Sequence, residues 1–255
     1  MSEHTIETEA TSVPGQETVI PEASSQDQQF APAPFGIPLG AQLLDKSRCH
    51  FRVWGPHLDE VELHIVAPND RRVKLEKSPD GYHEGVVDDC PEGTRYMFVI
   101  DGNERPDPAS RHQPEGVHKA SEVVGRDFEW HDSDWKGLPL EELVIYELHI
   151  GTFTEEGTFD SAIAKLDELR DLGVNAIELL PVAQFPGDRN WGYDGVYVGA
   201  AQASYGGPRG LKRLVDAAHQ RGIAVLLDVV YNHLGPEGNY LGEYGPYFTD
   251  RYKTP

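Results

Sequence analysis

The stretch IAVLLDVVYNHLGPEGN, residues 223–239, decides the fold. It begins with an apolar run as long as a buried strand and then places a carboxylate, an amide and an imidazole at Asp228, Asn232 and His233. A lone buried carboxylate is costly unless it is paired or hydrogen-bonded. We therefore expect Asp228 to be satisfied either by a neighbouring group or by a ligand.

Two similar apolar segments precede this one along the chain. VIYELHI (144–150) and NAIELLPV (175–182) predict strands, and each is followed by residues with helical periodicity, at 158–173 and 208–222. The strands contain few alternating polar residues, which is typical of a parallel sheet covered on both faces. The C-terminal half therefore reads as strand, helix, strand, helix, strand.

The N-terminal half has a different pattern. Short β-prone runs alternate with turn signals between residues 49 and 101, which predicts a small Ig-like antiparallel β-sandwich. Residues 1–34 contain no Lys or Arg and are rich in Glu, Ser, Thr, Gln and Pro, so we expect a disordered acidic tail of unknown purpose. We place the sandwich at residues 35–127 and the α/β part at residues 128–255.

Composition excludes several classes of function. A formal net charge of -21 argues against a nucleic-acid partner and favours neutral or cationic ligands. The chain shows neither an apolar run of the ~18–20 residues that a membrane span needs nor a secretory signal. Cys49 and Cys90 form no disulfide framework and no zinc spacing, and two small buried hydrophobes is a better interpretation than a pair facing across a sheet. We expect a cytoplasmic protein.

Polar and aromatic residues gather where the predicted strands end. In parallel α/β architectures the chemistry lies beyond the carboxyl ends of the strands. A cleft there would combine the Asp228 carboxylate, an imidazole from His149 or His233, and the ring faces of Trp191 and Tyr193, a mixture that suits a sugar. A purely structural role for each of these residues stays open on the residue pattern alone.

Two further carboxylates, Glu147 and Glu178, lie inside the first two predicted strands. They are either paired buried acids or side chains that point between layers. The sequence does not decide between these arrangements.

DVVYNH (228–233) resembles the first signature motif of the α-amylase family of glycoside hydrolases, at the end of the third strand of a (β/α)8 barrel. NAIELLPV and NWGYDG match that family's second strand and the loop after it. Three further segments resemble the malto-oligosyltrehalose trehalohydrolase group: FRVWGPHLDEVELHI, RPDPASRHQPEGVH and ELHIGTFTEEGTF. The resemblance runs from about Phe35 to the last residue. It implies a sandwich followed by the first three β/α units of an incomplete (β/α)8 TIM barrel.

The resemblance also implies a reaction, the hydrolysis of the α-1,4 bond of malto-oligosyltrehalose to release trehalose. By the family pattern, His233 hydrogen-bonds the sugar beside the scissile bond, Tyr193 stacks on that sugar, and Asp228 orients the site. The substrate-binding residues that we expect are Trp191, Tyr193, Asp194, Asp228, Asn232 and His233.

The residues that would break the bond are not expected in this chain. Retaining glycosidases need a nucleophilic carboxylate and a general acid ~5–5.5 Å apart. In the resembled family the nucleophile follows the fourth strand and the acid the fifth, whereas the resemblance here reaches only the loop after the third. We therefore expect the 255-residue chain to be inactive alone and to be the N-terminal part of a longer enzyme.

No cofactor is expected, because paired carboxylates hydrolyse glycosides without one. Asn232 occupies a position that helps bind calcium in some amylases, but no acidic cluster surrounds it, so we expect no metal. The expected partner is an α-glucan oligosaccharide, with no nucleic acid and no membrane. The alternatives are a fragment of a glycogen-branching glucanotransferase, a non-catalytic α-glucan-binding module, and a chain completed by a separately encoded remainder of the barrel.

Overall fold

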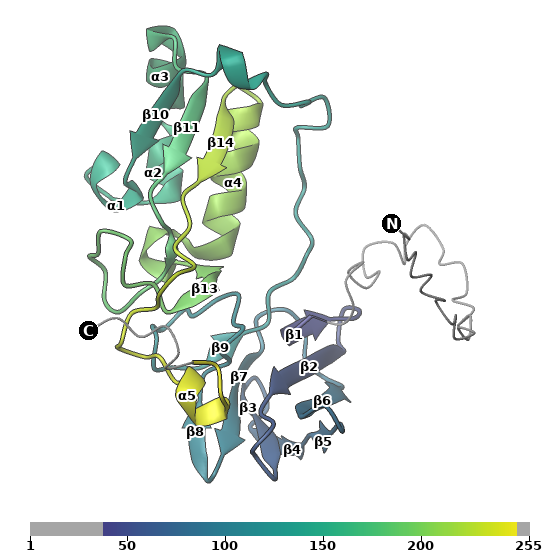
Figure 1. Cartoon of the computed structure of the whole chain (residues 1–255). Helices are drawn as coiled ribbons and strands as arrows, with labels where there is room; N and C mark the ends of the chain where they lie inside the picture. Colours follow the sequence, from purple (N-terminus) through teal and green to yellow (C-terminus); the bar gives the residue numbers. More distant parts are fainter. Residues whose placement is uncertain (1–37, 249–255) are drawn as a thin grey trace, which may run out of the picture. The chain divides into compact units, whose positions relative to one another are not determined.

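The computed structural model describes residues 38–248, which belong to the unit Pro32–Pro255. The predicted tail at residues 1–34 lies outside the described residues. Two antiparallel sheets occupy the N-terminal part of the described range (Figure 1). The first has the order β1 (Gly40–Leu43), β2 (Cys49–Trp54), β6 (Tyr82–Val87) and β5 (Glu76–Lys77). The second has the order β4 (Arg71–Lys74), β3 (Val61–Ala67), β7 (Arg95–Ile100) and β8 (Asn103–Arg105), and β9 (Ser121–Glu122) pairs with β7.

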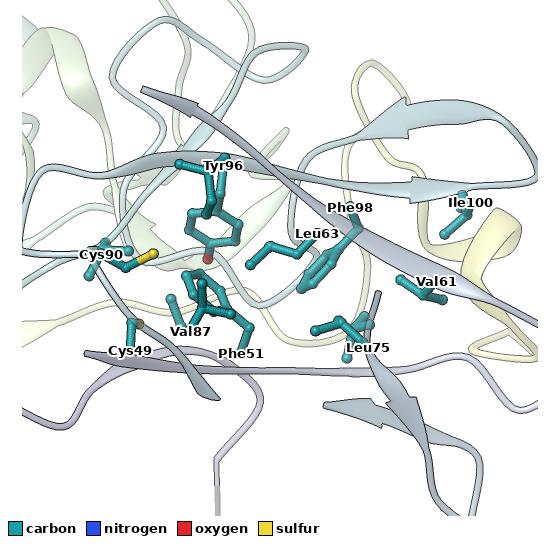
Figure 2. Packing of buried hydrophobic residues seen from close by; sticks show 14 of the residues in the cluster. Cys49, Phe51, Val61, Leu63, Leu75, Val87, Cys90, Tyr96, Phe98 and Ile100 are labelled. Atoms are coloured by element: carbon teal, nitrogen blue, oxygen red, sulfur yellow. The ribbon is translucent and has the colours of Figure 1, made fainter. Parts of the chain in front are cut away.

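The two sheets share one hydrophobic core. Residues alternate between buried and less buried along β2 and at the start of β3, as the two-residue period of a strand requires. Figure 2 shows Phe51 and Tyr96 in this core. Their rings meet edge to face at a centroid distance of 4.9 Å. Cys49 and Cys90 are free, buried thiols in the same cluster, as expected. The predicted β-sandwich is therefore confirmed.

Asp107 lies in the segment RPDPASRHQPEGVH and holds the backbone of this segment in place through hydrogen bonds. This carboxylate is fully buried and accepts hydrogen bonds from the Tyr96 hydroxyl at 2.5 Å and from the Ala109 backbone N–H at 2.8 Å. Burial raises the pKa of Asp107, and these two donors oppose that effect. Asp107 therefore has a structural role, because it ties this segment to Tyr96 of β7.

The C-terminal part contains the predicted parallel sheet. Its strands are β10 (Ile145–Leu148), β11 (Ala176–Leu179) and β14 (Ala224–Leu227), in that order, and Leu148, Leu179 and Leu227 are level at their carboxyl ends. Figure 1 shows these strands side by side, with α4 (Gly207–His219) beside β14. The other elements are η2 (Leu140–Glu142), α1 (Ile150–Phe153), α2 (Phe159–Ile163), α3 (Leu166–Leu172), β12 (Ala183–Gln184), β13 (Tyr197–Ala201), η3 (Ala203–Tyr205) and α5 (Leu241–Tyr244).

The helix expected over residues 158–173 is two helices, α2 and α3. Thr158 caps α2 through a capping box with Ser161, as its position predicts, and Gly173 ends α3 in the left-handed conformation. The helical ladder is interrupted between them, where the Lys165 N–H bonds the Ala162 carbonyl in a tighter turn. Within residues 38–248 no helix is both long and apolar enough to cross a membrane.

The expectation that both faces of the parallel sheet are covered is wrong for residues 38–248. Leu148, Ile177 and Leu179 face the helices and are buried in the second core cluster. On the opposite face Glu147 is exposed and Glu178 is half-buried, and the two are register partners. The helices of the described range pack on one face only, so these two acids are partly solvated and do not lie between layers.

The segment that follows β14 packs against the sandwich. Tyr244 is 1% exposed, belongs to the sandwich core, and donates its hydroxyl hydrogen to the Pro106 carbonyl at 2.9 Å. The Tyr247 hydroxyl donates to the Trp54 carbonyl at 3.0 Å, and its ring meets the Trp54 ring edge to face. The predicted division at residue 127 stays a prediction, but the sandwich core includes a residue far beyond it.

Candidate functional site

The loops that follow the three parallel strands form two hollows. Residues 188–195, in the connection between β12 and β13, carry Trp191 and Tyr193, and we call them the aromatic loop. One hollow, of about 600 Å³, lies against this loop; we call it the aromatic hollow. Its lining includes His149, Thr152, Asp188, Arg189, Trp191 and Tyr193. The sequence predicted one cleft that includes Trp191 and Tyr193, and the structure places both of them, together with His149, around this hollow.

The two aromatic side chains present their rings to solvent. Trp191 is 83% exposed and Tyr193 is 46% exposed. A large aromatic side chain that exposed contributes little to the core and offers a ring face on which the apolar side of a pyranose can stack. The structural alternative for Trp191, packing in the interior, is therefore excluded by its exposure.

Asn190 organises the aromatic loop from within. Its side-chain oxygen accepts the backbone N–H of Gly192 at 2.7 Å, and its side-chain nitrogen donates to the Asp194 carboxylate at 2.9 Å. Gly192 has φ +101, and a Cβ at this position would lie 2.8 Å from the Pro181 carbonyl oxygen. The tight turn that presents Trp191 therefore requires glycine at its centre.

Asp228 lies in a second, smaller hollow of about 130 Å³, which we call the aspartate hollow. Its backbone N–H donates to the Leu179 carbonyl at 3.0 Å, so Asp228 extends the ladder just past the end of β14. We expected a fully buried carboxylate within the strand, and this is wrong: the strand ends at Leu227 and Asp228 is half-buried. Within residues 38–248 its carboxylate makes no hydrogen bond, and because it is half-buried it is accessible to water or to a ligand.

His233 and Asn232 are exposed on the loop that follows. The Nε2–H of His233 donates to the Tyr193 carbonyl at 2.8 Å, which ties this loop to the aromatic loop. Neither residue lines either hollow, and the same is true of Asp194, whose carboxylate is held by Asn190. The structure therefore divides the six expected residues between two hollows and the loops beside them, and their role in substrate binding stays a prediction.

The sequence did not single out several residues around the aromatic hollow. Behind His149 lies Tyr205, which is 2% exposed and has its hydroxyl oxygen 3.4 Å from His149 Nε2. Burial raises the pKa of Tyr205 to about 12. Asp188 and Arg189 were inside the predicted loop, but no spacing marked them as lining residues. In the described range no three His, Cys, Asp or Glu side chains converge as a metal site would require.

The fold and this site define a class of protein. Residues 123–253 match the family model described as alpha amylase, catalytic domain, and residues 38–115 match carbohydrate-binding module 48, the isoamylase N-terminal domain. The chain belongs to the α-amylase family.

Within that family the chain is similar to malto-oligosyltrehalose trehalohydrolases. It is 54% identical over 213 residues to the enzyme of that name from Saccharolobus solfataricus, which covers 83% of this chain and 38% of the relative. It is 54% identical over 164 residues to the one from Deinococcus radiodurans, which covers 64% of this chain and 27% of that relative. A 1,4-alpha-glucan branching enzyme from Pseudoalteromonas atlantica is 30% identical over 250 residues, covering 85% of this chain and 34% of the relative. The chain thus spans less than two fifths of each of these relatives.

Solved structures support the membership of this chain in the α-amylase family. A crystal structure of a candidate alpha amylase from Salmonella typhimurium has a TM-score of 0.81 and 44% identity, covering 85% of this chain and 37% of that one. A pullulanase from an Anoxybacillus species, complexed with maltotetraose, has a TM-score of 0.68 and 25% identity, covering 88% of this chain and 39% of that one. The predicted sandwich followed by part of an α-amylase catalytic domain is confirmed; within residues 38–248 the barrel is not closed.

Proposed function

We propose that this chain supplies the sandwich and the first three β/α units of an enzyme that hydrolyses the α-1,4 bond of malto-oligosyltrehalose and releases trehalose. The observation that carries the proposal is the 54% identity over 213 residues with the Saccharolobus relative. That length is 83% of this chain. The proposal places the protein in trehalose biosynthesis.

The residues of this chain would bind and orient the substrate. The rings of Trp191 and Tyr193 are exposed at the aromatic hollow, where a pyranose ring can stack. The half-buried Asp228 carboxylate can accept hydrogen bonds from sugar hydroxyls, and the exposed His233 lies one loop away. Bond cleavage itself needs a nucleophilic carboxylate and an acid, which the family resemblance places after strands four and five.

The partner that we propose is an α-glucan oligosaccharide with a terminal trehalose. Support comes from the maltotetraose complex of the similar pullulanase and from the names of the relatives. The net charge of -21 supports the absence of a nucleic-acid partner. The free thiols of Cys49 and Cys90 support a cytoplasmic location, where thiols stay reduced.

A second candidate is a glucan-branching transferase. The branching enzyme from Pseudoalteromonas atlantica aligns over 250 residues, and this observation favours the candidate, but its identity is 30% against 54% for the trehalohydrolases. The match to carbohydrate-binding module 48 also supports glucan binding by the sandwich without any chemistry.

Product analysis distinguishes these candidates. We would fuse this chain to the C-terminal portion of the Saccharolobus relative, incubate the fusion with malto-oligosyltrehalose and with amylose, and separate the products by anion-exchange chromatography. Trehalose release supports the hydrolase, whereas new α-1,6 branches on amylose support the transferase. The C-terminal portion alone is the control. A fusion that binds malto-oligosyltrehalose without forming either product would contradict both enzymatic proposals.

A further inference from the structure

We propose that His149 is a positioning residue that holds the aromatic loop at the hollow through the Asn190 carbonyl. His149 directly follows β10 and caps α1, so its backbone is fixed by the first strand of the sheet. Its Nε2 lies 2.7 Å from the Asn190 carbonyl oxygen, 41 positions along the chain. This bond joins the loop after the first strand to the loop after the second.

The geometry determines which ring nitrogen carries the proton. A backbone carbonyl can only accept, so His149 Nε2 must carry a hydrogen. In the neutral ring Nδ1 is then an acceptor, and the Thr152 hydroxyl lies 3.4 Å from it. We therefore assign a hydrogen to His149 Nε2, with this donor committed to the aromatic loop.

The ring of His149 is held in place by its surroundings. The Tyr205 ring meets it edge to face, at a centroid distance of 6.0 Å and an interplanar angle of 82°. Gly151 allows this approach, because a Cβ there would lie 3.0 Å from both the His149 ring and the Tyr205 hydroxyl. Tyr205 is itself buried against Phe159 and Phe185. The donor therefore projects from a packed support and not from a free side chain.

The bond acts on the residue that organises the loop. Asn190 bonds His149 with its backbone carbonyl and bonds Gly192 and Asp194 with its side chain. On the other side of the loop, His233 donates to the Tyr193 carbonyl, but His233 is exposed to water whereas the His149 bond is partly buried. Water competes less with the His149 bond, so we expect it to be the stronger constraint.

The test uses the 255-residue chain and needs no ligand. Long-range ¹H–¹⁵N spectra of the histidine rings should show the Nε2–H tautomer for His149, assigned by its loss in His149→Leu. Hydrogen exchange of the peptide covering residues 188–195 should rise at least about tenfold in His149→Leu, where no donor remains. His149→Gln should restore protection, because the glutamine Nε2 is the same number of bonds from Cα and also donates.

The matched control is His57→Leu, because His57 is an exposed histidine of the sandwich without a contact to the loop. This variant should leave exchange at residues 188–195 unchanged. A wild-type Nδ1–H tautomer would overturn the proposal whether or not the leucine variant folds. Equal exchange in wild type, His149→Leu and His149→Gln would overturn it as well.

A second measurement links the loop to ligand binding and rests on the proposed function. Titration with maltoheptaose should give an affinity roughly three- to tenfold weaker in His149→Leu than in wild type, the effect of losing about one hydrogen bond. Affinity should return in His149→Gln. If wild type binds no glucan while the exchange results hold, the proposed function fails and the positioning role stands. If glucan binds equally in all variants while exchange differs, the loop position does not limit binding and the link is overturned.

Discussion

Replacing Tyr244 tests whether the segment after the third parallel strand is part of the sandwich core. The side chain is 1% exposed, its ring lies 6.3 Å from Phe98 in an edge arrangement, and its hydroxyl donates to the Pro106 carbonyl. Tyr244→Ala removes a buried aromatic ring and leaves a cavity, which costs about 3–5 kcal/mol. Tyr244→Phe keeps the ring but leaves a buried carbonyl without its donor, which costs about 1–3 kcal/mol.

The two variants can be compared by urea unfolding and by thermal melting of the 255-residue chain. For a protein of this size the alanine variant should melt roughly 10 °C lower than wild type, and the phenylalanine variant should fall between the two. Tyr231→Ala is the matched control, because Tyr231 is 77% exposed on the preceding loop. If Tyr244→Ala were no more destabilising than Tyr231→Ala, the sandwich core would not depend on this segment and the reasoning would be refuted.

Three further predictions concern binding, pH and activity. Trp191→Ala should weaken maltoheptaose binding in a calorimetric titration and leave the melting temperature unchanged, because the ring is 83% exposed. The Arg213 hydrogen bond lowers the pKa of Asp160, so this pair stabilises the fold above the ordinary Asp value of ~3.9 and loses that effect as the pH falls through the lower folded-state pKa. Asp160→Asn should therefore destabilise the chain by less than about 1 kcal/mol at pH 7, and the difference from wild type should shrink as the pH is lowered into the acid range, as measured in urea titrations. The 255-residue polypeptide alone should release no trehalose from malto-oligosyltrehalose, as measured by chromatography, since a nucleophile and an acid are both needed.

Sequence patterns correctly predicted those helix ends and strands whose positions depend on neighbouring residues. The start of the predicted helical segment at Thr158, its end at Gly173 and the strand β2 are each decided by residues within one turn or one strand, and each occurs where the sequence placed it. The order of the three parallel strands agrees with the first three β/α units of a barrel, which the family resemblance implied.

Long-range contacts explain what the sequence could not show. Tyr244 enters the sandwich core from more than a hundred residues beyond the sandwich strands, and no periodicity marks it. The division of the expected site between two hollows depends on where the aromatic loop turns. That turn is set by the bond of Asn190 to His149 and by the space left at Gly192. The His149–Asn190 and His233–Tyr193 bonds join positions that are 41 and 40 residues apart, and so they have no sequence signature.

The pair Glu147 and Glu178 constrains whatever covers the open face of the parallel sheet. The two residues are register partners on neighbouring strands, so both carboxylates project from the same face. They are tolerated in the described range because Glu147 is exposed and Glu178 is half-buried, so water solvates both charges. If an apolar layer covered this face, two like charges on adjacent strands would lose that solvation, which costs several kcal/mol per ion. A layer that closes a barrel here must therefore supply hydrogen-bond donors or a cation opposite this pair, or else one of the two acids must be protonated.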